Sequence, residues 1–368
     1  MFMKKIAIFG VKTLPFAGGI ETVVENTVPY LDRAEFAFIV YVRKRYHVNR
    51  EKFTNIKFVC IPHLNGKNTE ALSHTFLSCL HALIVERCDI YFFHAIVLGS
   101  LTFLPKLFLK KVILQTHGLD WKREKWGKIA KLFIKLSTKA AFIFTDRTIC
   151  VAKNDADFFL EKYGKRFEVV PNGIYCRPAI QLDPKFISMG LSSSRYILFM
   201  SRLVPEKGPH ILIDAFKKLD SLQDDIILVI AGDTNFKDEY YKSLLKEESP
   251  NIKFVGTVVG QLKQSLLSNA LVFVQPSSIE GMSISVLEAM SYGITTITSD
   301  IPENTILIGE YGLRFRKNNS DDLADKLKYF LKNKEHFMAQ KLERINYTKA
   351  SFGWDKSITK LNYLLENI

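Results

Sequence analysis

Residues 275–290, from Gln275 to Met290, read QPSSIEGMSISVLEAM. The apolar run Leu271–Val274 in front of them predicts a buried strand, and Ser283–Tyr292 predicts a helix that is mostly apolar apart from Glu288. A strand, a loop and a helix in this order form part of a βαβ unit, and ligands of parallel sheets bind at the carboxyl ends of the strands. The loop that follows Val274 is therefore the first candidate for a binding site.

Two acidic residues mark this stretch, Glu280 in the loop and Glu288 in the helix. An unpaired carboxylate in a buried helix is costly, and helical side chains tilt toward the helix N-terminus, so Glu288 can point back toward the loop. Two such acceptors predict a site for a ligand rich in hydroxyls, and the N–H groups of Gly281, Met282 and Ser283 can serve hydroxyl or phosphate groups. The alternative is that Glu288 pairs with a structural Arg or Lys.

The same alternation of strand and helix runs along the whole chain, which favours βαβ units and parallel sheets. Strands are expected at Lys5–Phe9, Phe36–Val42, Ile56–Ile61, Ile90–His94, Val112–Thr116, Ala141–Thr145, Glu168–Val170, Tyr196–Met200, Ile226–Ala231, Ile252–Val255, Leu271–Val274 and Ile294–Thr298. Helices are expected at Gly19–Leu31, Glu70–Glu86, Lys125–Thr138, Lys207–Leu219, Lys237–Lys246, Ser283–Tyr292 and Asp321–Leu331. The fold class is α/β, with two successive doubly wound patterns.

The pattern is interrupted once, between Pro171-Asn172-Gly173 and Ser192-Ser193-Ser194, and this interruption predicts an interdomain linker. We expect an N-terminal Rossmann-like domain in residues 1–173 and a C-terminal one in residues 174–350. A final helical segment is expected in residues 351–368.

The first strand of the second half is followed by Ser201-Arg202-Leu203-Val204-Pro205-Glu206-Lys207-Gly208. Arg202 and Lys207 flank a turn that enters a helix, where two cations oppose the helix dipole. A bound anion would offset this repulsion, and a diphosphate suits the pair because Arg grips two oxygens while Lys acts as a point charge. The alternative is a pair of solvated surface charges.

The first strand of the chain is followed by Ala17-Gly18-Gly19-Ile20-Glu21. Two glycines before a helix let a ligand approach the backbone and the helical N–H groups, as a phosphate or a sugar acceptor requires. An ordinary tight turn explains the pair equally well.

The net charge of +13 is placed unevenly. Through Asn172 there are 27 Lys and Arg against 15 Asp and Glu, whereas the remainder of the chain is nearly neutral. A basic half suggests contact with an anionic surface, and nucleic acid, membrane lipid and an anionic substrate are all candidates.

Five scattered cysteines form no C-x-x-C pair, so neither a disulfide framework nor a zinc site is indicated, and we expect a reducing cytoplasm. No apolar run approaches the roughly 20 residues that span a bilayer. The start of the chain is interpreted as the first strand and not as a signal peptide.

The spacing of Glu280 and Glu288 matches the E-x7-E motif of retaining glycosyltransferases, and the chain as a whole resembles glycosyltransferase family 4. This resemblance implies the GT-B architecture, in which two Rossmann-like domains face each other across a cleft. The motifs that carry it, besides E-x7-E and the order of the elements, are Gly18-Gly19, Arg202…Glu206-Lys207-Gly208, Pro171-Asn172-Gly173, Ala231-Gly232-Asp233 and Phe254-Val255-Gly256.

The resemblance also implies roles for individual residues. Arg202 and Lys207 would clamp the donor diphosphate, Glu288 would bind the nucleotide ribose, and Glu280 would contact the donor sugar. His117, in Gln115-Thr116-His117-Gly118, matches the family's active-site histidine, and His94 is a weaker candidate beside it. The remaining residues expected around the donor are Gly18, Gly19, Gly256, Gly281, Met282 and Ser283.

Two local features limit the resemblance. Tyr175 stands where the family often has an acidic residue shortly after Asn-Gly, which puts a linker contact to the ligands in doubt. Asp155-Ala156-Asp157 has the form of a D-x-D metal motif, but the surrounding residues predict the acidic first turn of a helix. We therefore expect no metal and no cofactor beyond the nucleotide-sugar co-substrate.

The stretch from Phe103 to Phe142 holds ten Lys or Arg residues against Asp120 and Glu124. Lys125, Lys128, Lys131, Lys135 and Lys139 share one face of the predicted helix, and Trp126, Ile129, Ala130, Phe133 and Ala140 share another. Trp121 precedes this helix. One interpretation is a surface that docks on anionic lipid. The other is a core-facing helix with a solvated lysine face.

The leading hypothesis is a metal-independent retaining glycosyltransferase at the inner face of a bacterial cell membrane. It would transfer a hexose-type sugar from a UDP-, GDP- or dTDP-linked donor to a sugar or lipid-linked acceptor during synthesis of surface polysaccharide or glycolipid. The alternatives are a nucleotide-sugar epimerase-like enzyme and a non-catalytic basic module that binds anions. No motif indicates nucleic-acid binding. The family resemblance further implies that the last helix returns to the N-terminal domain, with Phe352 and Trp354 near the crossing.

Overall fold

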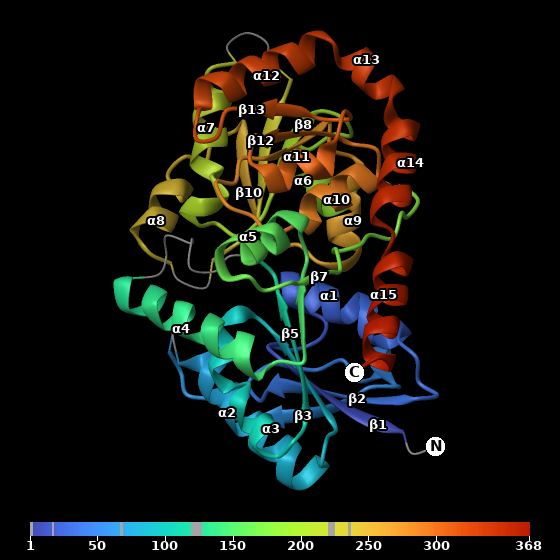
Figure 1. Ribbon diagram of the computed structural model, residues 1–368. Helices are drawn as coiled ribbons and strands as arrows, with labels where there is room; N and C mark the ends of the chain where they lie inside the picture. The colour runs from blue at the N-terminus through green and yellow to red at the C-terminus, as the bar shows by residue number, and fades with distance from the viewer. Residues whose placement is uncertain (1–2, 17, 67–68, 119–126, 220–224, 235–236) are drawn as a thin grey trace. The chain divides into compact units, whose positions relative to one another are not determined.

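The structure is a computed structural model that describes residues 3–16, 18–66, 69–118, 127–219, 225–234 and 237–368. The chain divides into two compact units (Figure 1). The N-terminal unit comprises Met1–Gly173 and Trp354–Ile368, and the C-terminal unit comprises Ile174–Gly353.

Within the described residues, the N-terminal unit contains a seven-stranded parallel sheet with the order β3-β2-β1-β4-β5-β6-β7. Its strands are β1 (Lys4–Phe9), β2 (Phe36–Arg43), β3 (Lys57–Ile61), β4 (Ile90–His94), β5 (Lys111–Thr116), β6 (Arg147–Cys150) and β7 (Glu168–Val169). Its helices are α1 (Gly19–Thr27), α2 (Glu70–His81), α3 (Phe103–Leu107), α4 (Lys128–Phe144), α5 (Lys153–Tyr163) and α15 (Trp354–Glu366).

The described part of the C-terminal unit contains a six-stranded parallel sheet with the order β10-β9-β8-β11-β12-β13. Its strands are β8 (Tyr196–Met200), β9 (Ile227–Ala231), β10 (Ile252–Gly256), β11 (Val272–Gln275), β12 (Thr295–Ser299) and β13 (Leu313–Phe315). Its helices are α6 (Pro184–Ser188), α7 (Pro209–Lys217), α8 (Glu239–Leu245), α9 (Gly260–Ser268), α10 (Ile284–Ser291), α11 (Pro302–Ile308), α12 (Ser320–Lys332), α13 (Lys334–Ala339) and α14 (Lys341–Phe352).

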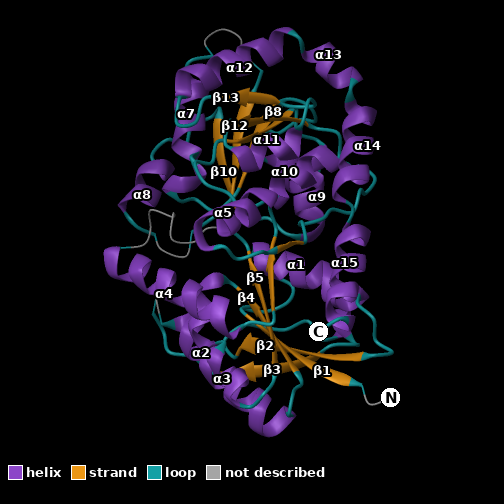
Figure 2. Ribbon diagram, viewed as in Figure 1, coloured by secondary structure: helices purple, strands orange, loops and turns teal. Residues whose placement is uncertain are grey.

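Both sheets are buried on both faces, because helices cover each side (Figure 2). In β1 the alternate residues Ile6 and Ile8 enter one core, and Ala7 and Phe9 enter the core on the opposite face. This double burial explains why the strands are continuous apolar runs and were predictable from the sequence. The expected α/β class with two doubly wound sheets is confirmed.

The segment Ala141–Thr145, expected as a strand, is the end of helix α4, and the prediction was wrong. Ala141 must be small because α4 packs closely on the 3-10 segment Ile96–Leu101, where a Cβ at Gly99 would lie 2.8 Å from the Ala141 Cβ. The strand that pairs with β5 is β6, which begins at Arg147. An apolar run five residues long does not distinguish a buried strand from a helix end.

The expected linker and C-terminal boundary also differ in detail. The stretch after Gly173 holds α6, whose Phe186 is fully buried in the C-terminal unit. At the other end, the C-terminal unit extends to Gly353, so that the segment within the N-terminal unit begins at Trp354 and not at residue 351.

Helix α15 completes the core of the N-terminal unit. Leu361, Leu364 and Leu365 are buried with residues of β1, β2 and α1, and the helix lies beside α1 (Figure 1). Polar contacts add to this packing, since the Asp32 N–H donates to Asn362 Oδ1 at 2.9 Å.

We predict that Leu364→Ala lowers the free energy of unfolding of the N-terminal unit by about 2–5 kcal/mol, because it removes a buried side chain and leaves a cavity. Tyr363→Ala is the matched control, since Tyr363 is exposed on the same helix and its loss should cost less than about 0.5 kcal/mol. Thermal unfolding followed by circular dichroism measures both. Equal melting temperatures for the two variants would show that α15 is only loosely attached.

Candidate functional site

The loop after β11 begins inside the protein. Gln275, Pro276 and Ser277 are buried, and Gly281 and Ser283 are buried again just before α10. Helix α10 then buries Val286 and Leu287 against the sheet. The N-terminus of α10, whose first N–H groups have no acceptor within the helix, is thereby fixed at the carboxyl edge of the sheet.

Glu280 is held firmly in this loop. Lys207 Nζ lies 2.6 Å from each of its carboxylate oxygens, and Gln275 Nε2 donates to its Oε1 at 2.9 Å. Both charged side chains are largely buried, with exposed fractions of 7% for Glu280 and 15% for Lys207. The carboxylate therefore has a defined position and a compensated charge. Gln275 is a site residue that the sequence analysis missed, although a polar residue that ends a buried strand could have suggested it.

The turn after β8 is locked against the loop after β11. Gly208 has a φ of +68°, and a Cβ there would lie 2.4 Å from the Pro276 carbonyl oxygen. The Ser278 N–H donates to the Glu206 carbonyl at 2.9 Å. These backbone contacts bring Lys207 to Glu280, whereas Arg202 stands exposed at the start of the turn.

We expected that a bound anion would offset the charge of Lys207, and the structure shows that a carboxylate of the protein also does so. The charge of Lys207 is offset by the carboxylate of Glu280. An incoming phosphate would share Lys207 with this carboxylate.

Glu288 forms an ion pair with Lys263 of α9, at 2.5 Å. This is the alternative considered above, a pairing of Glu288 with a structural lysine. The two glutamates of the E-x7-E motif therefore each hold a lysine, one on α9 and one on the turn before α7. Gly256, at the end of β10, has a φ of +68°, and no atom of the described residues lies within 4 Å of an added Cβ, so these residues leave space beside it.

In the N-terminal unit, Gly18 of the Gly18-Gly19 loop lies against the carboxylate of Glu21. A Cβ at Gly18 would lie 2.1 Å from Glu21 Oε2, whereas Gly19 has open space around it. Glu21 Oε1 accepts the Lys12 N–H at 2.9 Å. Burial raises the pKa of Glu21, and the hydrogen bond from Lys12 and the charges of Lys12 and Arg43 oppose that shift only in part. A side chain at position 18 would therefore have to displace the carboxylate of Glu21.

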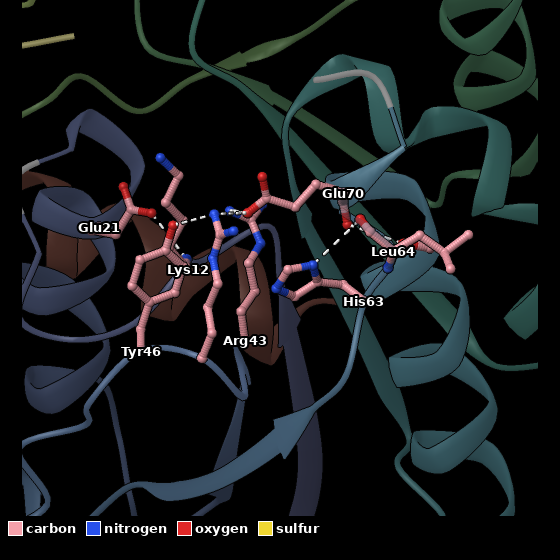
Figure 3. A network of polar contacts seen from close by, with 9 residues as sticks. Lys12, Glu21, Arg43, Tyr46, His63, Leu64 and Glu70 are labelled. Atoms are coloured by element: carbon pink, nitrogen blue, oxygen red, sulfur yellow. Dashed lines mark hydrogen bonds and ion pairs between the residues drawn. The ribbon is translucent and has the colours of Figure 1, made fainter. Parts of the chain in front are cut away.

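Next to this loop lies a network of charged residues that the sequence analysis did not single out. Figure 3 shows Arg43, at the end of β2, facing Glu70, near Lys12 and Glu21. The Arg43–Glu70 pair is 2.9 Å long, and Arg45 contacts the same carboxylate at 3.1 Å. The network lies where β1 and β2 end, the edge at which parallel sheets bind ligands.

His117 and His94 lie together at the ends of β5 and β4. His94 Nδ1 is 3.3 Å from His117 Nε2, and the rings stack with their centroids 5.6 Å apart. Burial holds the pKa of His94 well below its usual value, and the neighbouring His117 acts in the same direction. A neutral His94 can donate to, or accept from, His117 and so orient its ring.

The D-x-D sequence begins in the first turn of α5, where Asp155 is buried, and Asp157 is exposed. In the part of the chain that the structure describes, no group of three or more His, Cys, Asp or Glu side chains has the geometry of a metal site. The expectations placed on Asp120, Trp121, Glu124, Lys125 and Trp126 lie outside the residues that the structure describes.

The raised pKa of Glu21 predicts a pH effect on stability. A raised pKa favours the neutral carboxyl in the folded state, so its contribution is complete below about pH 4.5, the ordinary pKa, and is lost as the pH rises through the raised value. Glu21→Gln can still accept the Lys12 N–H but does not titrate. We expect its melting temperature relative to the native protein to increase with pH across that window. A difference that is constant or decreases with pH would contradict the assignment.

Comparisons with known proteins agree with the fold. The model of Glycosyltransferase Family 4 matches residues 17–177, and that of Glycosyl transferases group 1 matches residues 188–349. The chain is 26% identical over 365 residues to an uncharacterized glycosyltransferase of Methanocaldococcus jannaschii, covering 96% of each chain. It is 25% identical over 320 residues to the UDP-Gal:alpha-D-GlcNAc-diphosphoundecaprenol alpha-1,3-galactosyltransferase of Escherichia coli, covering 83% of this chain and 82% of the relative.

Solved structures share the fold at low identity. The Anabaena protein HepE in complex with UDP-glucose superimposes with a TM-score of 0.79 at 16% identity, covering 99% of this chain and 100% of the other. Sucrose-phosphate synthase from Thermosynechococcus elongatus gives a TM-score of 0.77 at 15% identity, covering 99% and 98%. The two family models together span most of the chain, and the predicted resemblance is confirmed. The chain belongs to the family 4 type of glycosyltransferases with the GT-B fold, and it resembles the enzymes of bacterial surface-polysaccharide synthesis.

Proposed function

We propose that this glycosyltransferase transfers a hexose-type sugar, with retention of configuration, from a UDP-, GDP- or dTDP-linked donor to a sugar or lipid-linked acceptor. The observation that carries the proposal is the junction of the β8 turn with the β11 loop, where Lys207, Glu280 and the N-terminus of α10 meet. The process it would serve is synthesis of a bacterial surface polysaccharide or glycolipid.

The names of the relatives support a nucleotide-sugar donor and a lipid-linked acceptor. The Escherichia coli relative is named for UDP-Gal and a diphosphoundecaprenol acceptor. A relative from Xanthomonas oryzae pv. oryzae, 26% identical over 238 residues, is named a GDP-mannose:cellobiosyl-diphosphopolyprenol alpha-mannosyltransferase. Because these two donors carry different bases, the relatives support the class of donor and leave its base open.

The main task of the donor site would be to stabilise the departing diphosphate. Arg202 and Lys207 supply positive charge, and the N-H groups at the start of α10, including those of Gly281, Met282 and Ser283, supply donors that are already oriented. In a largely buried site such preorganised charge acts without a metal ion. We propose a metal-independent reaction on this ground.

The two glutamates would bind the two sugar rings of the donor. Glu280, fixed by Lys207 and Gln275, would accept hydroxyl hydrogen bonds from the sugar, and Glu288 would accept those of the ribose. Gly256 would leave room for the nucleotide. In the N-terminal unit, Gly18 and Gly19 would admit the diphosphate or the acceptor, and His117, oriented by His94, would contact the reacting groups.

We further propose that the enzyme works in the cytoplasm, at the inner face of the cell membrane, through the basic N-terminal unit. None of the helices in the described residues is long and apolar enough to cross a membrane. Attachment to the membrane surface would bring the enzyme to a lipid-linked acceptor.

The donor assignment predicts stabilisation by nucleotides. UDP, GDP and dTDP should be screened, and the matching nucleotide at about 100 times its dissociation constant should stabilise the protein by about 2.7 kcal/mol. Arg202→Ala removes a charge-assisted contact of about 1.5–3 kcal/mol, which weakens binding roughly 10- to 150-fold. At the same nucleotide concentration the stabilisation should then fall to about half or less. The shift should persist in EDTA.

The matched control is Lys217→Ala, which removes an exposed cation at the end of α7. Lys217 forms an ion pair with Glu247, which follows α8. This variant should keep the full nucleotide shift. Arg202 is preferred to Lys207 for this test, because loss of Lys207 would leave the buried Glu280 without its counter-charge. If no nucleotide shifts the melting curve, or if both variants lose the shift equally, the donor site is misassigned.

A further inference from the structure

Helix α4 presents three distinct faces, although an ordinary surface helix has two. The buried face holds Ile134, Ser137, Thr138 and Ala141, which pack the helix on the N-terminal unit. A second face is apolar and exposed: Ile129 is 86% exposed, Leu132 59%, Leu136 54% and Ile143 72%. At about 100° per residue these four lie within one stripe, together with the partly exposed Phe133. We call this stripe the α4 ridge.

The α4 ridge cannot be buried in the core by a small rotation of the helix. The helix is held by the close approach of its buried face to Gly99, where a Cβ would lie 2.4 Å from the Ser137 carbonyl oxygen. Turning the ridge inward would break this contact. The alternative of a core-facing helix with a solvated lysine face is therefore wrong for Ile129 and Phe133, which point away from the core.

The third face carries Lys128, Lys131, Lys135 and Lys139, next to the ridge on the helical wheel. Helix α4 contains no Asp or Glu, and among the described residues no carboxylate pairs with these four lysines. A stripe of cations with no carboxylate partner among the described residues thus runs along a stripe of exposed apolar side chains for the length of the helix, about 25 Å.

The neighbouring helix α3 ends in a second exposed apolar group, Leu107, Phe108 and Leu109. The two helices touch, and the rings of Phe103 and Phe144 lie 6.3 Å apart. Leu109 is 92% exposed and has a φ of +56°, a conformation that favours glycine. Leucine in this conformation is unfavourable for the fold and its side chain is almost fully exposed, which points to a use outside the chain's own core.

We propose that the α4 ridge and the Leu107–Leu109 turn insert into the interfacial region of an anionic phospholipid bilayer, with the lysine face on the headgroups. A helix with an apolar face and a lysine-rich face lies in the plane of such an interface. Protein–protein interfaces are depleted of lysine, so the charge pattern favours lipid over a protein partner. This contact rests on the proposed function in one respect: a lipid-linked acceptor is the reason for the enzyme to bind a membrane.

Vesicle sedimentation with the full chain tests the proposal. Phosphatidylcholine vesicles with and without about one third phosphatidylglycerol are compared at about 0.1 M and 0.5 M NaCl, which separates screened charge attraction from apolar insertion. The variant Ile129→Ser/Leu132→Ser/Leu136→Ser should bind the anionic vesicles at least about tenfold more weakly at both salt concentrations. The variant Lys128→Gln/Lys135→Gln/Lys139→Gln should lose binding mainly at low salt.

The matched control is Ile306→Ser/Met338→Ser/Leu342→Ser, which removes three exposed apolar side chains from the C-terminal unit and should bind like the native protein. Leu109→Gly tests whether weaker vesicle binding can arise without a loss of stability. Glycine adopts the positive φ of this position without strain, so the variant should fold at least as well as the native protein. It should melt at the same or a higher temperature and yet bind the vesicles several-fold more weakly.

Equal binding by the ridge variant and its control would overturn the proposal. The proposal would also be overturned if the native protein did not bind vesicles but formed a dimer, and the ridge variant were monomeric. The ridge would then join two copies of the chain. The nucleotide-induced melting shift should remain in every variant. Vesicle binding needs no sugar transfer, so a failure of the proposed enzyme activity would leave this result unchanged.

Discussion

The loops at the carboxyl edge of the C-terminal sheet depend on one close backbone contact. Gly208 can adopt its positive φ and lie against the Pro276 carbonyl only because it has no side chain. The N-terminal unit repeats the arrangement, since Gly10 has a φ of +103° and a Cβ there would lie 2.4 Å from the His94 carbonyl oxygen. In each sheet this contact lies where the strand order reverses, between β1 and β4 or between β8 and β11. Two loops distant in sequence are thereby held together at the edge where α/β sheets bind ligands.

The side chains of both candidate sites follow from this contact. In the C-terminal unit it brings Lys207 to Glu280, and the buried ion pair fixes both groups. In the N-terminal unit it leaves His94 buried and neutral beside His117. A charged pair in a largely buried place adds little net stability but holds its members in a defined geometry. The side chains of both candidate sites are therefore ordered by contacts within the protein itself.

Much of the fold was predictable from the sequence, because strands buried on both faces are continuous apolar runs. Ile90–His94 and Tyr196–Met200 were predicted to the residue. The errors fall where local pattern is ambiguous: in Ala141–Thr145 the small Ala141 packs on Gly99 whereas Ile143 is exposed, and β13 has only three residues. The partners of the site residues could not be predicted, because the pairs Lys207–Glu280 and Lys263–Glu288 join residues 73 and 25 positions apart. The direction of the apolar face of α4 was equally hidden, since periodicity shows that a stripe exists but not which stripe meets the core.

The central claim, that the junction of the β8 turn and the β11 loop binds the nucleotide sugar, can be tested by amide hydrogen exchange. Exchange is measured by mass spectrometry with and without the nucleotide that stabilises the protein most. The account predicts slower exchange in peptides that cover residues 202–208 and 277–288, because the phosphates and the sugar would engage N–H groups there. Stabilisation by the nucleotide with protection confined to other segments, and none at these two, would contradict it.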